Sequence, residues 1–331
     1  LLEEGAYETA VQRIKPLLKR FPDHGGLHRA LVVALEHSKG AQAAGLAAFS
    51  WAERRPNSLP AQEALLHFAT GLHHLMLAER AAAKVRELGG ETPGFPLDPA
   101  LKHAMLTQPD GTPADPEAMT CFDISKLHLQ ANDFAGTLHW LEGLDLVPAR
   151  NNRALALFHL DRVDESLGAF LANWERDPHN LFALGWAVRL RLYQGDETGA
   201  RELCSPLAAA TARRVEDALA QCDALLLVRR DQSAWDAFER STGSDWFEAD
   251  DVGIEGLRLR HFGACAASRL GKGADAHRWW QAVLAVDPDF ALTRANLGKI
   301  GADGLGLDGK PLSLPVVFDL HQSLPVPWME A

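Results

Sequence analysis

Apolar positions recur along the chain with the spacing of an α-helix, and a proline closes each segment in which they do so. The closing stretches read RFPD at 20–23, RRPN at 54–57, RDPH at 176–179 and VDPD at 286–289. A small residue lies twelve positions before each proline, and the positions eight and five before it are apolar, with the exception of Asn173. Positions i, i+4 and i+7 share one face of a helix, so the pattern predicts a helix that packs closely on a neighbour.

A partner helix accompanies at least two of these segments. Residues 181–204 and 256–288 each divide into two helices at glycine, the first stretch at Gly195 and the second at Gly271 and Gly273. Glycine can adopt the left-handed conformation that ends a helix. One such pair cannot bury its own apolar faces and must stack on the next pair. The pattern therefore predicts a repeated helix hairpin.

The spacing of the closing prolines gives the length of the repeat. Pro22 and Pro56 are 34 residues apart, which indicates a period of 34 residues. This period, the paired helices, the small residue and the closing proline together resemble tetratricopeptide repeats. The resemblance covers the following stretches: 5–22, 25–56, 59–90, 119–178, 181–204 and 256–288. It implies an all-α fold, a right-handed superhelical solenoid of antiparallel helix pairs, in which the first helix of each pair lines a concave groove.

Departures from the repeat divide the chain into regions. We expect repeats at 1–90 and at 119–300, and the first unit lacks its first helix, which suggests a chain that begins inside a longer array. Residues 91–118 are rich in proline and glycine and predict an irregular insertion, whereas 205–255 predict helices that are out of phase with the repeat. The proline-rich tail at 301–331 is expected to be extended. It is apolar enough to pack against the last repeats or, alternatively, to begin a further domain.

Candidate binding residues are those expected to face the groove from the first helices. They are Arg29, His67, Asn151, Asn152, Trp186, Arg189, Tyr193, Arg258, His261 and Asn296. The later members are mostly cationic or carry amides, and these groups bind carboxylates and peptide backbones. We therefore expect an extended peptide or partner segment in the groove, with acidic side chains or a terminal carboxylate. The alternative is that some of the arginines pair with acidic residues across repeats.

The tryptophans divide by their positions. Trp51 and Trp280 fall on core positions of second helices, so we expect them to be buried, whereas Trp186 is expected to face outward into the groove.

Motifs for catalysis or cofactor binding are weak. GLGLDG at 304–309 matches GxGxxG, but no strand pattern precedes it and Lys310-Pro311 follows it. His24 and His28 lack a third ligand for zinc, and the acidic run at 245–255 lacks the glycine and alternating oxygen ligands of a calcium loop. We therefore expect no cofactor, no metal and no catalytic residues.

Composition adds constraints on partners and compartment. The formal net charge of −11 argues against binding to nucleic acid or to an anionic membrane. The chain has no run of eighteen apolar residues, so we predict no membrane span. The four cysteines, Cys121, Cys204, Cys222 and Cys265, are far apart and form no CxxC pair. They predict free thiols in a reducing compartment, so we expect a cytoplasmic protein.

These observations favour a non-catalytic scaffold for protein–protein interaction. One alternative is a regulatory or substrate-recognition arm of a larger enzyme, with the catalytic part outside this chain. A second alternative is a structural protein that assembles with itself.

Overall fold

The computed structural model describes residues 1–107, 112–247, 253–301, 305–306, 309–310, 312, 315 and 317. Within these ranges all regular secondary structure is helical, which confirms the predicted all-α class. The only β-type pairings in the described residues are isolated bridges, Thr107 with Pro113 and Ile300 with Gly306. The chain divides into two compact units, Leu1–Arg162 and Val163–Ala331.

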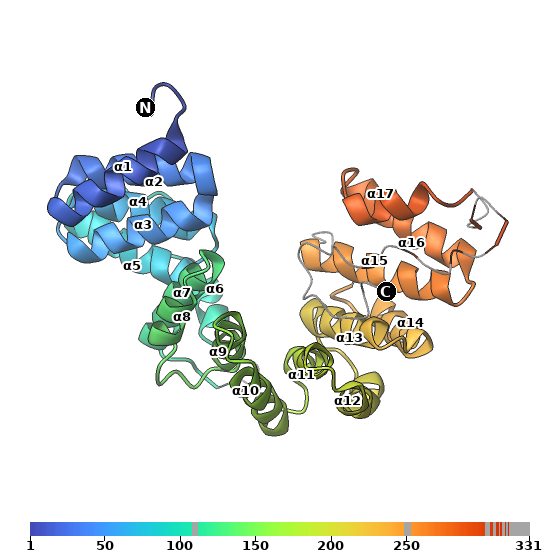
Figure 1. Ribbon diagram of the computed structural model, residues 1–331. Helices are drawn as coiled ribbons and strands as arrows, with labels where there is room; N and C mark the ends of the chain where they lie inside the picture. The colour runs from blue at the N-terminus through green and yellow to red at the C-terminus, as the bar shows by residue number, and fades with distance from the viewer. Residues whose placement is uncertain are drawn as a thin grey trace. The chain divides into compact units, whose positions relative to one another are not determined.

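Unit 1, the first of these, is a stack of antiparallel helices. Its helices are α1 (Tyr7–Arg20), α2 (Gly25–Lys39), α3 (Ala41–Arg54), α4 (Leu59–Gly71), α5 (Leu75–Glu87), α6 (Pro99–Met105), α7 (Pro116–Gln130), α8 (Phe134–Trp140) and α9 (Val147–His159). Consecutive helices from α1 to α5 pack on one another, and α7 packs on α5, α3 and α8 (Figure 1). The hairpins α2/α3, α4/α5 and α7/α8 are the pairs that the sequence pattern predicts.

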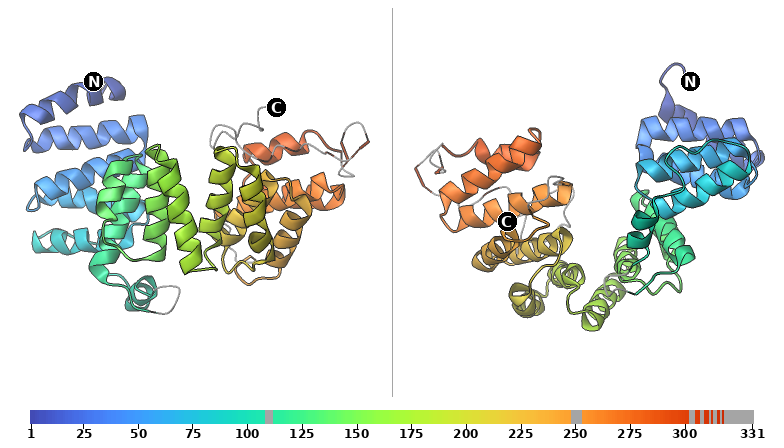
Figure 2. Two further views of the ribbon diagram at one scale, coloured as in Figure 1. Left: turned by 60° about the horizontal axis from the view of Figure 1, so that its bottom comes forward. Right: turned by 180° about the vertical axis from the view of Figure 1, so that it is seen from behind.

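Unit 2 continues the same architecture within its own boundaries. Its helices are α10 (Val163–Arg176), α11 (Leu181–Tyr193), α12 (Glu197–Ala209), α13 (Val215–Leu227), α14 (Asp231–Thr242), α15 (Ile254–Arg269), α16 (Gly273–Val286) and α17 (Ala291–Leu297). The first helices of successive pairs contact each other, α11 with α13 and α13 with α15. Figure 2 shows this stacking from two further sides.

The segment 205–255, expected to be out of phase with the repeat, contains one of these pairs. Helices α13 and α14 are antiparallel neighbours that pack between α11 and α15. The turn that joins them passes through Arg229, with φ of 58°, where glycine would be the ordinary residue.

The same geometry recurs at the other hairpin turns. The bend between the two helices places one residue at positive φ in each case: Gly40, His73, Asn132, Gly195, Arg229 and Gly271. The left-handed positions predicted at Gly195 and Gly271 are thus confirmed, with φ of 78° and 75°, whereas Gly273 is the first residue of α16 and is not at positive φ.

The small residues of the sequence pattern lie inside the stacks. Ala10, Ala44, Ser166 and Ala276 are at most 2% exposed. Trp51 and Trp280 are also buried, as predicted. Leu17 differs, with 42% of its surface exposed, because α1 is the outermost helix of unit 1 and packs only against α2.

The regions predicted to be irregular are described in part. Between α5 and α7 lies the short helix α6, whose N-terminus is capped by the Asp98 carboxylate. In the tail, Leu312 and Val317 pack against the core of unit 2, and the Ser268 hydroxyl donates to the Leu312 carbonyl. Most of the predicted tail, residues 304, 307 and 308 of GLGLDG, and residues 248–252 of the acidic run lie outside the described residues.

Candidate binding groove

A groove of about 840 Å³ lies in unit 2, on the side formed by the first helices of its pairs. Its walls come from α11, α13 and α15, and it is closed at one end by the α16–α17 connection and α17. Four of the candidate residues predicted from sequence line it: Trp186, Arg189, Arg258 and His261. Trp186 thus borders the groove, and the binding role of all four stays a prediction.

The floor of the groove depends on a close approach of two helices. Gly185 on α11 faces the backbone of α13, and a Cβ at this position would lie 2.9 Å from the carbonyl oxygen of Ala220. Both residues line the groove. Any side chain at Gly185 would therefore push α11 away from α13 and change the shape of the floor.

Trp186 is held in a fixed orientation by its neighbours. Its ring stacks on Phe170 of α10, with centroids 5.7 Å apart and planes 12° apart. The Arg189 guanidinium lies over the indole at 5.3 Å from the ring centroid. Arg189 also forms an ion pair and hydrogen bond with Asp223 of α13. The expected alternative, an arginine paired with an acidic residue across repeats, is therefore confirmed for Arg189.

His261 lies at the base of the groove and is fully buried. Its Nδ1 lies 2.9 Å from the Thr293 hydroxyl and its Nε2 lies 3.2 Å from the Val317 carbonyl oxygen. With the proton on Nε2, the imidazole donates to Val317 and accepts from Thr293. These contacts tie α15 to α17 and to the described part of the tail.

A cysteine, a histidine and an asparagine meet beside this position. The Cys265 Sγ lies 3.5 Å from His261 Nε2, and the Asn296 amide donates to Cys265 Sγ at 3.8 Å. Thiol catalysis needs an accessible sulfur whose pKa is lowered. Cys265 and Asn296 are fully buried, and burial raises the pKa of the Cys265 thiol far above its ordinary value. This trio therefore has the environment of a packed core and not that of a nucleophile.

The charge of the groove differs from what its arginines alone suggested. Five carboxylates line it: Glu216, Asp223, Glu255, Asp287 and Asp289. Sequence reasoning missed them because it considered the outward faces of first helices, whereas these residues lie mostly at helix ends. Glu216 and Glu255 are in the first turns of α13 and α15. Asp287 and Asp289 belong to the closing motif VDPD, which was the available signal.

The remaining candidate residues lie outside this groove lining. Arg29 and His67 are exposed on α2 and α4 of unit 1. Asn151 is buried and Asn152 half-buried on α9, and Tyr193 is half-buried at the last residue of α11.

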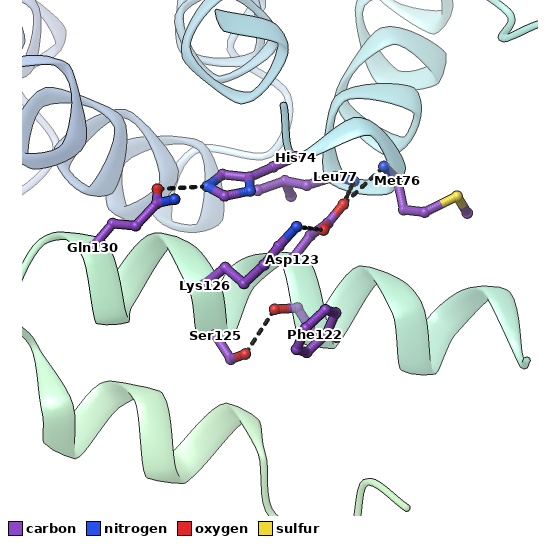
Figure 3. A network of polar contacts seen from close by, with 8 residues as sticks. All are labelled: His74, Met76, Leu77, Phe122, Asp123, Ser125, Lys126 and Gln130. Carbon is purple, nitrogen blue, oxygen red and sulfur yellow. Dashed lines mark hydrogen bonds and ion pairs between the residues drawn. The ribbon is translucent and has the colours of Figure 1, made fainter. Parts of the chain in front are cut away.

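In unit 1 the polar side chains of a first helix are used for internal contacts (Figure 3). The amide groups of Met76 and Leu77, at the N-terminus of α5, donate to Asp123 Oδ2 at 2.8 and 3.3 Å. Lys126 forms an ion pair with Asp123 Oδ1 at 2.8 Å. His74 Nε2 donates to Gln130 Oε1 at 3.0 Å. Helix α7 thus caps and anchors α5.

The candidate metal-binding histidines have structural partners. The His24 side chain accepts from the Leu27 amide at 3.2 Å, and His28 Nε2 lies 2.7 Å from the Pro22 carbonyl oxygen. Across the described ranges, no cluster of three or more His, Cys, Asp or Glu residues is placed to hold a metal ion. The described helices also include none with the length and apolar character needed to cross a membrane.

Neither a protein-family model nor a curated protein matches the chain. Several solved structures are similar to it, two of which are described here. One is a tetratricopeptide repeat protein from Parabacteroides merdae ATCC 43184, with 13% identity, 78% of this chain and 93% of that chain covered, and a TM-score of 0.35. The other is the TPR domain of P58(IPK), with 14% identity and a TM-score of 0.28. The match covers 89% of this chain and 83% of that chain.

Proposed function

We propose that this chain is a non-catalytic scaffold for protein–protein interaction, and that the unit 2 groove binds an extended segment of a partner protein. The observation that carries the proposal is the convergence of Trp186, Arg189, Arg258 and His261 on one groove of about 840 Å³. Trp186 and Arg189 come from α11, Arg258 and His261 come from α15, and all four were selected from sequence only as faces of first helices. A groove of this volume accommodates several side chains of a bound peptide.

The aromatic lining supports a binding role. Phe182, Trp186, Phe262 and Phe290 all border the groove, and Trp186 is already fixed by its stack on Phe170. A rigid aromatic side chain loses little conformational freedom when a ligand covers it, and tryptophan is enriched among residues that dominate binding energy. The groove therefore offers preorganised apolar area to a partner.

The state of the thiols supports a cytoplasmic location as part of this proposal. Cys204, Cys222 and Cys265 are buried and Cys121 is half-buried, and all four are free. Burial raises the pKa of Cys204 to about 11 and that of Cys222 to about 12. Thiols of this kind suit a compartment in which cysteines stay reduced.

Selection of a displayed library of random peptides on the full chain tests the proposal. Selected peptides should lose affinity about 30-fold when Trp186 is replaced by alanine, because truncation of a buried aromatic anchor removes about 2 kcal/mol of binding energy. Ile254→Ser provides a second variant, since Ile254 lines the groove but is 47% exposed and contributes little to the core.

The matched controls are Arg29→Ala and His67→Ala, two exposed candidates of unit 1. They should leave the affinity within about twofold of the parent chain. Failure to select any peptide, or selected peptides that bind both groove variants as well as the parent, would contradict the proposal.

A further inference from the structure

The groove carries more negative than positive charge. Five carboxylates, Glu216, Asp223, Glu255, Asp287 and Asp289, line it together with two arginines, Arg189 and Arg258. Two further arginines outside the lining, Arg214 and Arg294, pair with Glu216 and Asp289. Arg189 and Asp223 pair with each other, and their side chains are only 14% and 15% exposed. The charges of Arg189 and Asp223 therefore cancel at the floor of the groove. The charge that a ligand meets is therefore set by the other four carboxylates together with Arg258.

Two of these four carboxylates, Glu216 and Asp289, have exposed ion-pair partners that leave them able to bind a ligand. Glu216 lies 3.9 Å from Arg214, and both side chains are about half exposed. Asp289 pairs with Arg294 at 3.0 Å, with side chains 90% and 60% exposed. Exposed pairs of this kind contribute between about 0 and 1 kcal/mol, so a cationic ligand can compete for the same carboxylates.

Helix dipoles act unequally on the groove. Glu216 and Glu255 lie in the first turns of α13 and α15, where the positive end of each helix offsets about half a charge. Asp287 is the C-cap of α16, so its carboxylate adds to the negative end of that helix. At the same end, Asp289 precedes the N-cap of α17 and pairs with Arg294.

We infer that the occupant of the groove is an extended protein segment in which lysine or arginine side chains flank an apolar anchor. This inference rests on the proposed function and reverses the charge expected from sequence. The anchor packs against Trp186 and Phe290, and the basic side chains pair with Glu255 and Asp289.

Charge also separates this occupant from the tail of the chain itself. Val317 borders the groove, and residues 318–331 follow it directly. That stretch contains Asp319 and Glu330 and neither lysine nor arginine. An acidic segment would be repelled by the same carboxylates that attract a basic one.

The test uses the full chain and two labelled synthetic peptides that share one tryptophan anchor and differ only in lysine or glutamate at the flanking positions. Fluorescence anisotropy should show that the lysine peptide binds at least about tenfold more tightly at low salt, and that the difference shrinks as added salt screens the charges.

The decisive variant replaces Glu216→Gln, Glu255→Gln and Asp289→Asn together. All three side chains are exposed or half-buried, and the replacements keep their size. We expect the preference for lysine to fall to about threefold or less. The matched control is Glu197→Gln, Glu202→Gln and Glu239→Gln, three exposed carboxylates of unit 2 that do not line the groove. It should keep the full preference.

Each outcome decides a different claim. A preference for the glutamate peptide, or no charge preference in binding that still depends on Ile254, overturns the inference and leaves the proposed function in place. Failure of both peptides to bind, together with an empty library selection, overturns both. Displacement of the lysine peptide by a synthetic peptide of residues 318–331 would assign the groove to the tail of the chain and overturn the inference.

Discussion

The two units build the same helix hairpins but use the polar positions of their first helices differently. In unit 1, Asp123 and Lys126 of α7 are engaged with each other and with the start of α5. In unit 2, Trp186 of α11 and Arg258 of α15 border a groove. A position on a first helix can therefore hold neighbouring helices together or face a ligand, and its place in the repeat does not decide which.

Helix capping explains the use of Asp123 at α5. Helix α5 has no side-chain cap of its own at His74, so its amide groups use a carboxylate from α7. In unit 2, α11 and α12 are capped locally, because Asn180 accepts from the Ala183 amide and Asp196 accepts from the Gly199 amide. Their amide groups need no carboxylate from the next pair.

Replacement of Asp123 by alanine should have the largest effect. Asp123 is 3% exposed, and its loss leaves two amide groups and the Lys126 ammonium without their acceptor. We expect unit 1 to lose about 3 kcal/mol of stability, because buried partners of a removed charge are left unsatisfied. Hydrogen exchange read by mass spectrometry should show the loss of protection in α5 and α7.

The control is Asp123→Asn, which keeps an acceptor oxygen and should recover part of the protection. Helices α11 to α16 of unit 2 should be unchanged in both variants. An equal loss of protection in the two units would contradict the local role of Asp123.

Replacement of Gly185 by alanine should have an intermediate effect confined to unit 2. The new methyl group would lie 2.9 Å from the Ala220 carbonyl oxygen, which is backbone and cannot rotate away. We expect destabilisation of about 1–3 kcal/mol from overpacking, measured as a lower thermal midpoint and faster exchange in α11 and α13.

Gly168→Ala is the matched control for this change. Gly168 lies in α10, and a Cβ there would meet no atom within 4 Å. Alanine should stabilise this helix by about 0.5–1 kcal/mol. The same loss in both variants would show that the approach of α11 to α13 is not tight.

The pH response of unit 1 should give the smallest effect. Burial lowers the pKa of His74, the Lys126 ammonium lowers it further, and the Asp123 carboxylate opposes both. The folded-state pKa therefore lies below the unfolded value of 6.5, so the unfolded chain takes up the proton first. His74 leaves stability unaffected above this value and reduces it as the pH falls through 6.5 toward the folded-state pKa.

Hydrogen exchange of α5 and α7, corrected for the intrinsic rate, would be compared at about pH 7.5 and about pH 5.5. The parent chain should lose more protection than His74→Asn, which has no proton to bind at this position. Identical losses in the two proteins would remove His74 as the cause.

The sequence predicted the hairpins where a proline follows the second helix or a glycine lies at the bend. Proline closes α3, α10 and α16, and glycine marks the bend inside the pairs α11/α12 and α15/α16. The pair α13/α14 lacks such a mark because its bend lies at Arg229. Its packing between two regular pairs, and not its local sequence, accounts for its place in the stack.

Helical periodicity in the sequence predicted which helix faces line the groove, but it did not predict the charge of the groove. Outward faces of helices follow from a period of 3.6 residues, and this period identified Trp186 and Arg189 correctly as groove residues. The pairing of Arg189 with Asp223 depends on the register between α11 and α13, and the contributions of Asp287 and Asp289 depend on where a loop lies. The pairing of Arg189 and the position of this loop both follow from tertiary packing, which helical periodicity alone does not predict.

The bends of the hairpins have a consequence for how such chains diverge. Of the six hairpin-bend residues named above, three are not glycine: His73, Asn132 and Arg229. A residue with a side chain costs about 1 kcal/mol in the left-handed region, whereas each large apolar side chain buried by stacking contributes about 1.5–3 kcal/mol. A stack of hairpins can therefore exchange the residue at one bend after another and keep the course of its backbone. The helix-hairpin fold can therefore be kept while the glycines that mark its bends are replaced.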